Sequence, residues 1–216
     1  MDALMMLDGP HAPQVGGNRP AVVALGCDPG PRSGAAVLVD VHARRLLRVV
    51  MWRPRVRQRQ QVVEVTHWAS VDGAPAEGVV VSTHIGPPGG PEVARYLLHL
   101  GERRPSTVAV EAVRSYGRVR AASLVALAES AGEAIGALMA SGAPVPMRPA
   151  AAEWRHSLAR IPASTPADEC DRIVRLTLER LGWHVPEVVD HGATWDAIGV
   201  ALYGAAHAGR ALREAA

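Results

Sequence analysis

Three acidic residues stand where the sequence pattern places the ends of secondary-structure elements. Asp28 ends an apolar run of strand length, Glu111 lies in a short β-branched run, and Asp196 falls in the first turn of a C-terminal helical pattern. Segments so far apart can converge at one sheet edge, where three carboxylates would repel one another unless cations lay between them. Mg²⁺ takes oxygen ligands and keeps positions for water and phosphate. Two such ions about 4 Å apart cleave phosphodiesters, so this is the chemistry that the three acids would support.

Each acid also has an ordinary structural explanation. Asp28 precedes Pro29 and Gly30 and suits a turn. Glu111 could be a paired strand residue, and Asp196 could be a charge favoured by the dipole at a helix N-terminus. Taken singly, none of them identifies a site. Taken together, and with a basic stretch elsewhere in the chain, they are better explained as a site.

Arginine supplies the entire cationic inventory of this lysine-free chain. All 23 basic residues are Arg, the formal net charge is +2, and the segment 44–60 holds seven Arg and no acid. Arginine binds phosphate bidentately and stacks on bases, so a local basic face suits nucleic acid. A merely solvated, soluble edge explains this segment equally well, and composition alone leaves both interpretations open.

Composition favours a soluble globular protein. The 216 residues are 48% hydrophobic and 20% charged, which is enough to bury a sizeable core. We see no apolar run approaching the roughly 20 residues of a membrane span, and the N-terminus lacks the pattern of a signal peptide. Cys27 and Cys170 match no zinc spacing and form no disulfide framework. We therefore expect a cytoplasmic protein with two reduced core cysteines and no membrane partner.

Strand-like and helical patterns follow one another in an order typical of a mixed α/β domain. Short turns between the first three strands predict an antiparallel meander. Strand-like runs at 62–68 and 77–85 predict a hairpin insertion between 62 and 85, whose place the sequence does not fix. Expected strands are 21–27, 34–40, 45–52, 106–113 and 143–149, and expected helices are 91–104, 117–142, 150–161, 167–182 and the segment from 191 onward.

No internal repeat or interdomain linker is evident, so one domain is favoured. Residues 1–19 are rich in Gly, Pro and Met without a period and predict a flexible leader. The remaining residues, 20–216, form the predicted domain, an α/β layered fold built around one sheet.

Four motifs, in order, resemble RuvC-type Holliday junction resolvases of the RNase H-like superfamily. They are ALGCDPGPRSGAAVLVD, VAVEAVRSYGRVRAASLVALAESAGEAIGAL, PMRPAAAEWRHSL and ATWDAIGVALYG, and they cover most of residues 21 to 208. The resemblance implies an RNase H-like mixed five-stranded sheet flanked by helices. It also implies nicking of branched DNA with Mg²⁺, or Mn²⁺ as a substitute, by a homodimer without an organic cofactor.

Carried over residue by residue, the resemblance makes Asp28, Glu111 and Asp196 the catalytic metal ligands. The family commonly has a fourth acid or His three residues before the last Asp, where this chain has Ala193. Upstream of that position, His191 is a candidate catalytic residue and Asp190 a candidate metal ligand. His191 could equally be a residue of the helix start.

The expected nucleic-acid contacts are cationic or aromatic residues near the motifs. Resolvases often place a lysine near the scissile phosphate, but the segment ASTPADECD offers Asp168, Glu169 and Asp171 instead, so arginines nearby would substitute. Tyr116 is the first aromatic after Glu111 and could contact DNA or simply pack in a turn. The full set is Arg53, Arg55, Arg57, Arg59, Arg114, Tyr116, Arg118, Arg120, Arg148 and Arg155.

Two other functions remain open at this stage. An RNase H-like nuclease that processes structured RNA would carry the same motifs. A catalytically silent nucleic-acid-binding module of the same fold would explain the missing fourth ligand and the acids in place of lysine.

Overall fold

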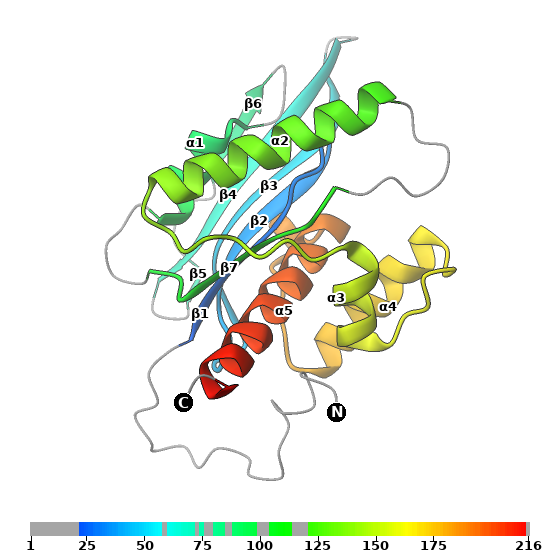
Figure 1. Ribbon diagram of the computed structural model, residues 1–216. Coiled ribbons are helices and arrows are strands. Elements are labelled where there is room, and N and C mark those ends of the chain that lie inside the picture. The colour runs from blue at the N-terminus through cyan, green and yellow to red at the C-terminus, as the bar shows by residue number, and fades with distance from the viewer. Residues whose placement is uncertain are drawn as a thin grey trace.

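The computed structural model describes residues 22–57, 60–71, 74–75, 80–84, 88–98, 104–113 and 121–214. The predicted leader, 1–19, lies outside this part of the chain. One sheet runs through the described residues, with helices on both of its faces (Figure 1).

Six strands form the sheet in the order β6-β4-β3-β2-β1-β7, and the two-residue strand β5 pairs with the end of β4. Strands β1 and β7 are parallel, and the other neighbours are antiparallel. The first three strands therefore form the predicted meander. The bounds are β1 (Val23–Asp28), β2 (Gly34–Asp40), β3 (Arg45–Arg57), β4 (Gln60–Val71), β5 (Ala74–Pro75), β6 (Val80–His84) and β7 (Thr107–Val110).

The predicted count of five strands is wrong. Within the segment 62–85, where a hairpin insertion was expected, β4 pairs with β3 from Arg48–Ala69 to Arg57–Gln60, and β6 pairs with β4. These two strands extend the sheet at its edge. The expected strand at 143–149 forms only one isolated bridge, between Met147 and Ala109, because prolines within this segment remove ladder donors.

The helices divide between the two faces of the sheet (Figure 1). Helices α1 and α2 cover one face, whereas α3, α4 and α5 cover the other. The bounds are α1 (Gly90–Leu98), α2 (Ala121–Ala140), α3 (Ala151–Ala159), α4 (Ala167–Arg180), the 3₁₀ turn η2 (Glu187–Val189) and α5 (Gly192–Glu214).

Alternate side chains of each strand enter two separate cores. Ala24 and Val37 pack with α3, α4 and α5, whereas Leu25 and Leu38 pack with α1 and α2. Burying one such Val or Leu contributes about 1.5–3 kcal/mol. A slip of one residue would exchange the two faces, so the hydrophobic pattern fixes the strand register that positions the acids.

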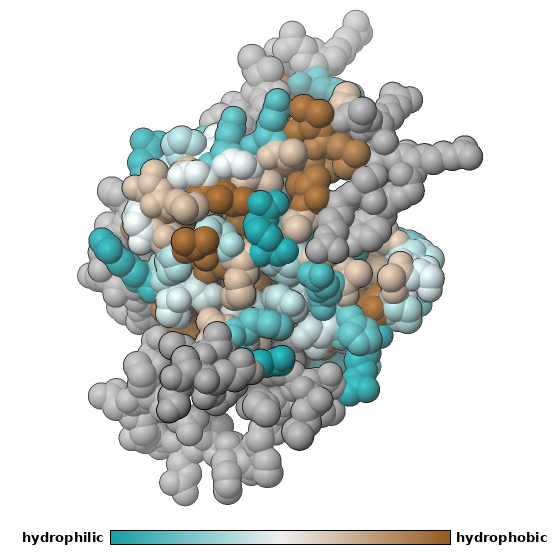
Figure 2. All heavy atoms as spheres, viewed as in Figure 1, coloured by the Kyte–Doolittle hydropathy of each residue, from teal (hydrophilic) through white to brown (hydrophobic). Residues whose placement is uncertain are grey.

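Helix α2 has a large exposed apolar surface. Contrary to the expectation from sequence, its residues Ala122–Ala140 are long and apolar enough to cross a membrane by length and composition. Leu138 enters the core beside α1, but Val125 and Met139 are 56% and 47% exposed. Figure 2 shows hydrophobic side chains gathered over this helix.

Candidate active site

Close packing of α5 on β1 brings two of the predicted acids together. A Cβ on Gly26 would collide with the carbonyl oxygen of Ala197, so only glycine permits this approach. Asp28 ends β1 two residues after Gly26, and Asp196 directly precedes Ala197 on α5. The start of α5 therefore meets the C-terminal end of β1.

Glu111 joins these acids from the neighbouring strand. Its backbone N–H donates to the carbonyl oxygen of Cys27 at 2.9 Å, which continues the parallel pairing of β1 and β7. Its Oε2 accepts the Nε1–H of Trp154 at 2.8 Å. Trp154 is fully buried, and its ring lies where a side chain on Gly199 of α5 would be. Helix α3 thus locks the orientation of the Glu111 carboxylate.

Asp196 is buried and has one strong partner. Its Oδ2 accepts a hydrogen bond from Nη2 of Arg155 at 2.6 Å, while its Oδ1 is buried without a hydrogen-bond partner. The same Arg155 nitrogen lies 3.7 Å from Oδ1 of Asp171 on α4. Arg155 therefore provides a cation beside at least two carboxylates, and one oxygen of Asp196 still lacks a donor.

Crowding of carboxylates in a buried place shifts their pKa values upward. Burial, followed by the charges of Glu111 and Asp196, raises the pKa of Asp28 well above its ordinary value. Burial raises the pKa of Glu111, although Trp154 and Arg155 oppose the rise. For Asp196, burial outweighs the Arg155 ion pair and raises the pKa to about 7. One arginine therefore does not compensate the acids, which need a further cation to ionise together.

The donor set suits a divalent ion, but the described residues do not form a ready-made cage. No group of three His, Cys, Asp or Glu side chains in the part of the chain that the structure describes lies close enough to hold a metal. The guanidinium of Arg155 lies beside Asp196 and Asp171. Burial lowers its pKa, but the Asp196 ion pair and then the charge of Glu111 outweigh burial and raise it. The orphaned oxygen of Asp196 and the hard oxygen donors around it fit Mg²⁺ or Mn²⁺ once Arg155 moves.

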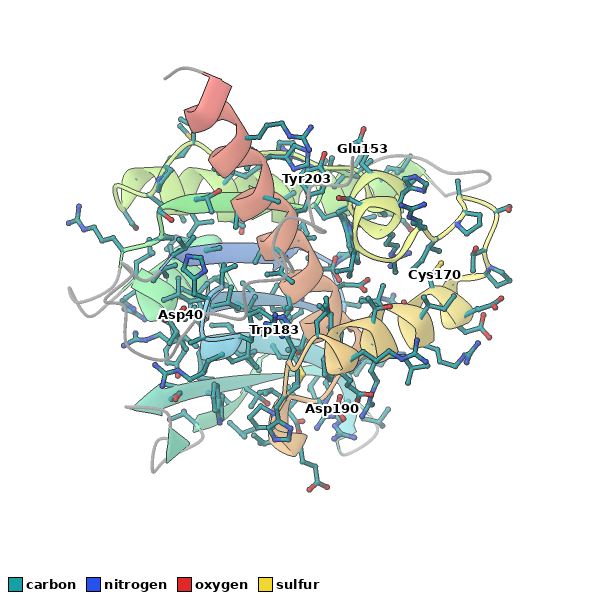
Figure 3. The ribbon with its side chains drawn as sticks, turned by 90° about the horizontal axis from the view of Figure 1, so that it is seen from below. Asp40, Glu153, Cys170, Trp183, Asp190 and Tyr203 are labelled. Carbon is teal, nitrogen blue, oxygen red and sulfur yellow. The ribbon has the colours of Figure 1, made fainter. Side chains whose placement is uncertain are left out.

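Asp190 is engaged in structural contacts. Its Oδ1 accepts the Nε1–H of Trp195 at 2.7 Å, and its Oδ2 lies 3.0 Å from Nη2 of Arg175. Figure 3 labels Asp190 on the segment that leads into α5 and Cys170 on the adjacent helix α4. Both oxygens of Asp190 thus hold the approach to α5 in place, and its predicted role as a metal ligand stays a prediction.

His191 lies directly before α5 and is half-buried. Its Nδ1 accepts the backbone N–H of Ala193 at 3.2 Å, which leaves the proton of the neutral ring on Nε2. Burial, then the charge of Arg53, lowers its pKa, while Asp171 and Asp190 oppose this effect. A neutral ring in this tautomer can donate a hydrogen bond through Nε2 but cannot accept a proton there.

The predicted DNA-contacting residues divide into three groups. Arg53 and Arg55 on β3 both contact Oε1 of Glu64, at 2.9 and 3.4 Å, and Arg55 is exposed. Arg148 is exposed, and its charge opposes the rise that burial and the neighbouring acids cause in the pKa of Cys27. Arg155 instead points into the acids. Arg57 ends β3, and its side chain lies outside the described residues, as do Arg59, Arg114, Tyr116, Arg118 and Arg120.

A separate cavity of about 460 Å³ lies on the other side of the sheet. Arg48, His67, Glu92, Arg95 and Tyr96 are among its lining residues, and none of the acids above contributes to it. Catalytic chemistry is therefore better sought at the carboxylate cluster.

Sequence reasoning missed the two contacts that organise this cluster. Trp154 lies in the third motif, but nothing in the sequence indicates that its indole donates a hydrogen bond to Glu111. Asp171 appeared only as one of several acids in place of a lysine, yet it lies beside Arg155. Asp171 lies beside the buried stripe of Cys170, Val174 and Leu178 on α4. This position next to the apolar face of the helix is the signal that could have singled it out from the other acids.

Comparisons with known proteins give little beyond this geometry. A scan against models of protein families finds no match, and neither does a search of curated proteins. Among solved structures, the chain is similar to T. thermophilus RuvC in complex with Holliday junction substrate, with 18% identity, 88% of this chain and 96% of that chain covered, and a TM-score of 0.44. Similarity at this level identifies neither a family nor a function, so any assignment rests on the sheet and the acids of this chain.

Proposed function

We propose that this chain is an RNase H-like, metal-dependent endonuclease that nicks branched DNA such as Holliday junctions. The observation that carries the proposal is the convergence of Asp28, Glu111 and Asp196 from β1, the end of β7 and α5, with one buried Asp196 oxygen left unpaired. Carboxylates crowded in this way are the ligands that Mg²⁺ or Mn²⁺ prefers. The substrate would be a phosphodiester, in keeping with an arginine-only cationic inventory.

The three acids would hold the metal, and neighbouring residues would set their geometry. Bound Mg²⁺ or Mn²⁺ supplies Lewis acidity for attack of water on phosphorus and for departure of the 3′ oxygen. Trp154 fixes Glu111 through its hydrogen bond to Oε2. His191, with its proton on Nε2, is suited to donate a hydrogen bond to a phosphate oxygen or to a water.

Arginines on and beside the sheet would bind the DNA arms. Arg55 on β3 and Arg148, in the segment between α2 and α3, are both exposed. Phosphate contacts of this kind make affinity salt-dependent because each contact releases counterions. The remaining predicted contacts, from Arg59 and from Arg114 to Arg120, belong to the same proposal.

A homodimer formed through α2 is part of the proposal. Cβ atoms added to Gly132 and Gly136 would meet no atom within 4 Å, so this helix has room for close approach by another helix. Its exposed Val125 and Met139 add apolar surface. Two copies would present two sites to two of the four strands of a junction, and light scattering of the purified chain tests this state directly.

A catalytically silent nucleic-acid-binding module is the second candidate. The 2.6 Å pair between Arg155 and Asp196 favours it, because the arginine already neutralises a predicted metal ligand. In that case the chain would bind branched nucleic acid without cutting it. Processing of structured RNA is a variant of the nuclease proposal that uses the same acids.

A substrate panel separates these functions. We would incubate the native chain with Mg²⁺ or Mn²⁺ and labelled four-way DNA junctions, linear duplexes and structured RNA. The proposal expects nicking of junctions, loss of nicking in Asp196→Asn, and native activity in Asp168→Asn, which removes an exposed acid from α4. Cleavage of RNA alone would favour the RNA enzyme, and junction binding without any cleavage would favour the silent module.

A further inference from the structure

Helix α5 presents no ligand of its own one turn before Asp196, but a carboxylate from another helix lies there. Ala193 is buried and carries only a methyl group. A Cβ on the adjacent Gly192 would lie 3.4 Å from Oδ2 of Asp171, at van der Waals contact, so this carboxylate lies directly beside the start of α5. Asp171 thus approaches the acid cluster from α4, at a side that α5 itself leaves without an oxygen donor.

Asp171 and Asp196 converge on the same cation. Nη2 of Arg155 lies 2.6 Å from Oδ2 of Asp196 and 3.7 Å from Oδ1 of Asp171. The charge of Asp171 also contributes to the raised pKa of Asp28. Because the Asp171 side chain is half-exposed, it is free to adjust to a smaller cation than a guanidinium.

A second observation points to a ligand at this place. Oδ1 of Asp196 is buried and accepts no hydrogen bond, although the residue is only 6% exposed. Leaving such an acceptor unsatisfied costs about 1–3 kcal/mol or more for a charged group, which a bound cation would offset. Asp190 cannot complete the set without giving up Trp195 and Arg175.

We propose that Asp171 is the fourth carboxylate of this site and binds a divalent cation together with Asp196 after Arg155 withdraws. This inference rests on the proposed metal-dependent function and adds one ligand to it. It also gives Arg155 a role, as an internal counter-ion to Asp196 and Asp171 in the absence of metal.

Calorimetric titration with Mn²⁺ alone, without nucleic acid, tests this proposal. We expect Asp171→Asn to bind Mn²⁺ at least about tenfold more weakly than the native chain, as for loss of a metal-site contact. The matched control is Asp168→Asn, which removes an exposed acid one turn earlier on α4 and should bind Mn²⁺ like the native chain. Asp171→Glu, which keeps the carboxylate, should restore most of the affinity.

A double-mutant cycle separates a ligand from a residue that merely draws Arg155 away. In an Arg155→Gln background, Asp171→Asn should still weaken Mn²⁺ binding at least about tenfold if Asp171 is a ligand. An effect that disappeared in this background would overturn the proposal. Thermal unfolding in EDTA shows whether each variant is folded. If Arg155→Gln does not fold, the Mn²⁺ affinities of Asp171→Glu and Asp171→Asn are compared instead, and equal affinities would overturn the proposal.

The outcome also distinguishes this inference from the proposed function. Mn²⁺ binding and junction nicking by the native chain, with unchanged affinity in Asp171→Asn, would overturn the role of Asp171 and leave the nuclease proposal standing. No Mn²⁺ binding by the native chain would overturn both.

Discussion

Stability of the metal-free protein should fall as pH rises through the acidic range, because Asp196 holds its proton more tightly when folded. Its pKa rises from 3.8 to about 7 mainly by burial. The stabilisation from the protonated group is complete below about pH 4 and is lost by about pH 7, since the folded state binds the extra proton only in this window. One pKa unit is worth about 1.4 kcal/mol, so the loss is on the order of 4 kcal/mol.

Urea unfolding in EDTA at a series of pH values measures this loss, and Asp196→Asn isolates it. The raised pKa values of Asp28 and Glu111 act in the same direction as that of Asp196. The lowered pKa of half-buried His191 acts in the opposite direction just below its ordinary value of 6.5. The contributions of Glu111 and His191 are common to both proteins and cancel in the comparison. That of Asp28 is smaller in the variant, because the charge of Asp196 no longer raises its pKa.

The variant curve should be flatter than the native curve between pH 4 and 7 by on the order of 4 kcal/mol. Loss of the Arg155 partner in Asp196→Asn displaces the whole curve but does not tilt it, because arginine stays charged throughout this range. Native and variant curves that ran parallel within about 1 kcal/mol would refute the raised pKa of Asp196.

Three further predictions address neighbouring parts of the structure. Trp154→Phe removes the donor to Glu111 and should raise the pKa of that acid further, moving the pH profile of Mn²⁺ affinity upward; an unchanged profile would contradict the contact. Gly136→Ala meets open space on α2 and should raise the free energy of unfolding by about 0.5–1 kcal/mol in urea titrations of the monomer, whereas a decrease would show a crowded site. Arg55→Gln should lower the slope of log affinity against log salt for junction binding by about one, and an unchanged slope would exclude a phosphate contact.

The positions of β1, β2, α4 and α5, which include the elements that carry Asp28 and Asp196, were largely predictable from sequence. Asp28 and Asp196 stood out because each lies at an end of a long, patterned element, and β1, β2 and α5 begin close to the predicted positions. The predicted helix 167–182 corresponds to Ala167–Arg180, since an acidic start and Gly182 mark its ends. Local patterns of this kind depend on few distant contacts.

The parts that sequence did not predict depend on packing between distant elements. Strand β4 joins the sheet through its register with β3, and β6 through its register with β4, and no local pattern specifies either register. The pair between Arg155 and Asp196 depends on how α3 rotates when Trp154 packs over Gly199. Arg155 was therefore predicted to contact DNA, while the described structure places it against an acid.

Single-turnover cleavage of a labelled four-way DNA junction tests the central claim most directly. The chain is in excess, Mg²⁺ or Mn²⁺ is supplied, and the native protein is compared with Asp28→Asn, which keeps the shape of the β1 end and removes one carboxylate. The account predicts nicks near the branch point by the native chain and at least a hundredfold slower cleavage by the variant, roughly 3 kcal/mol in activation free energy. Equal cleavage by both proteins, or binding of the junction without any cleavage by the native chain, would contradict it.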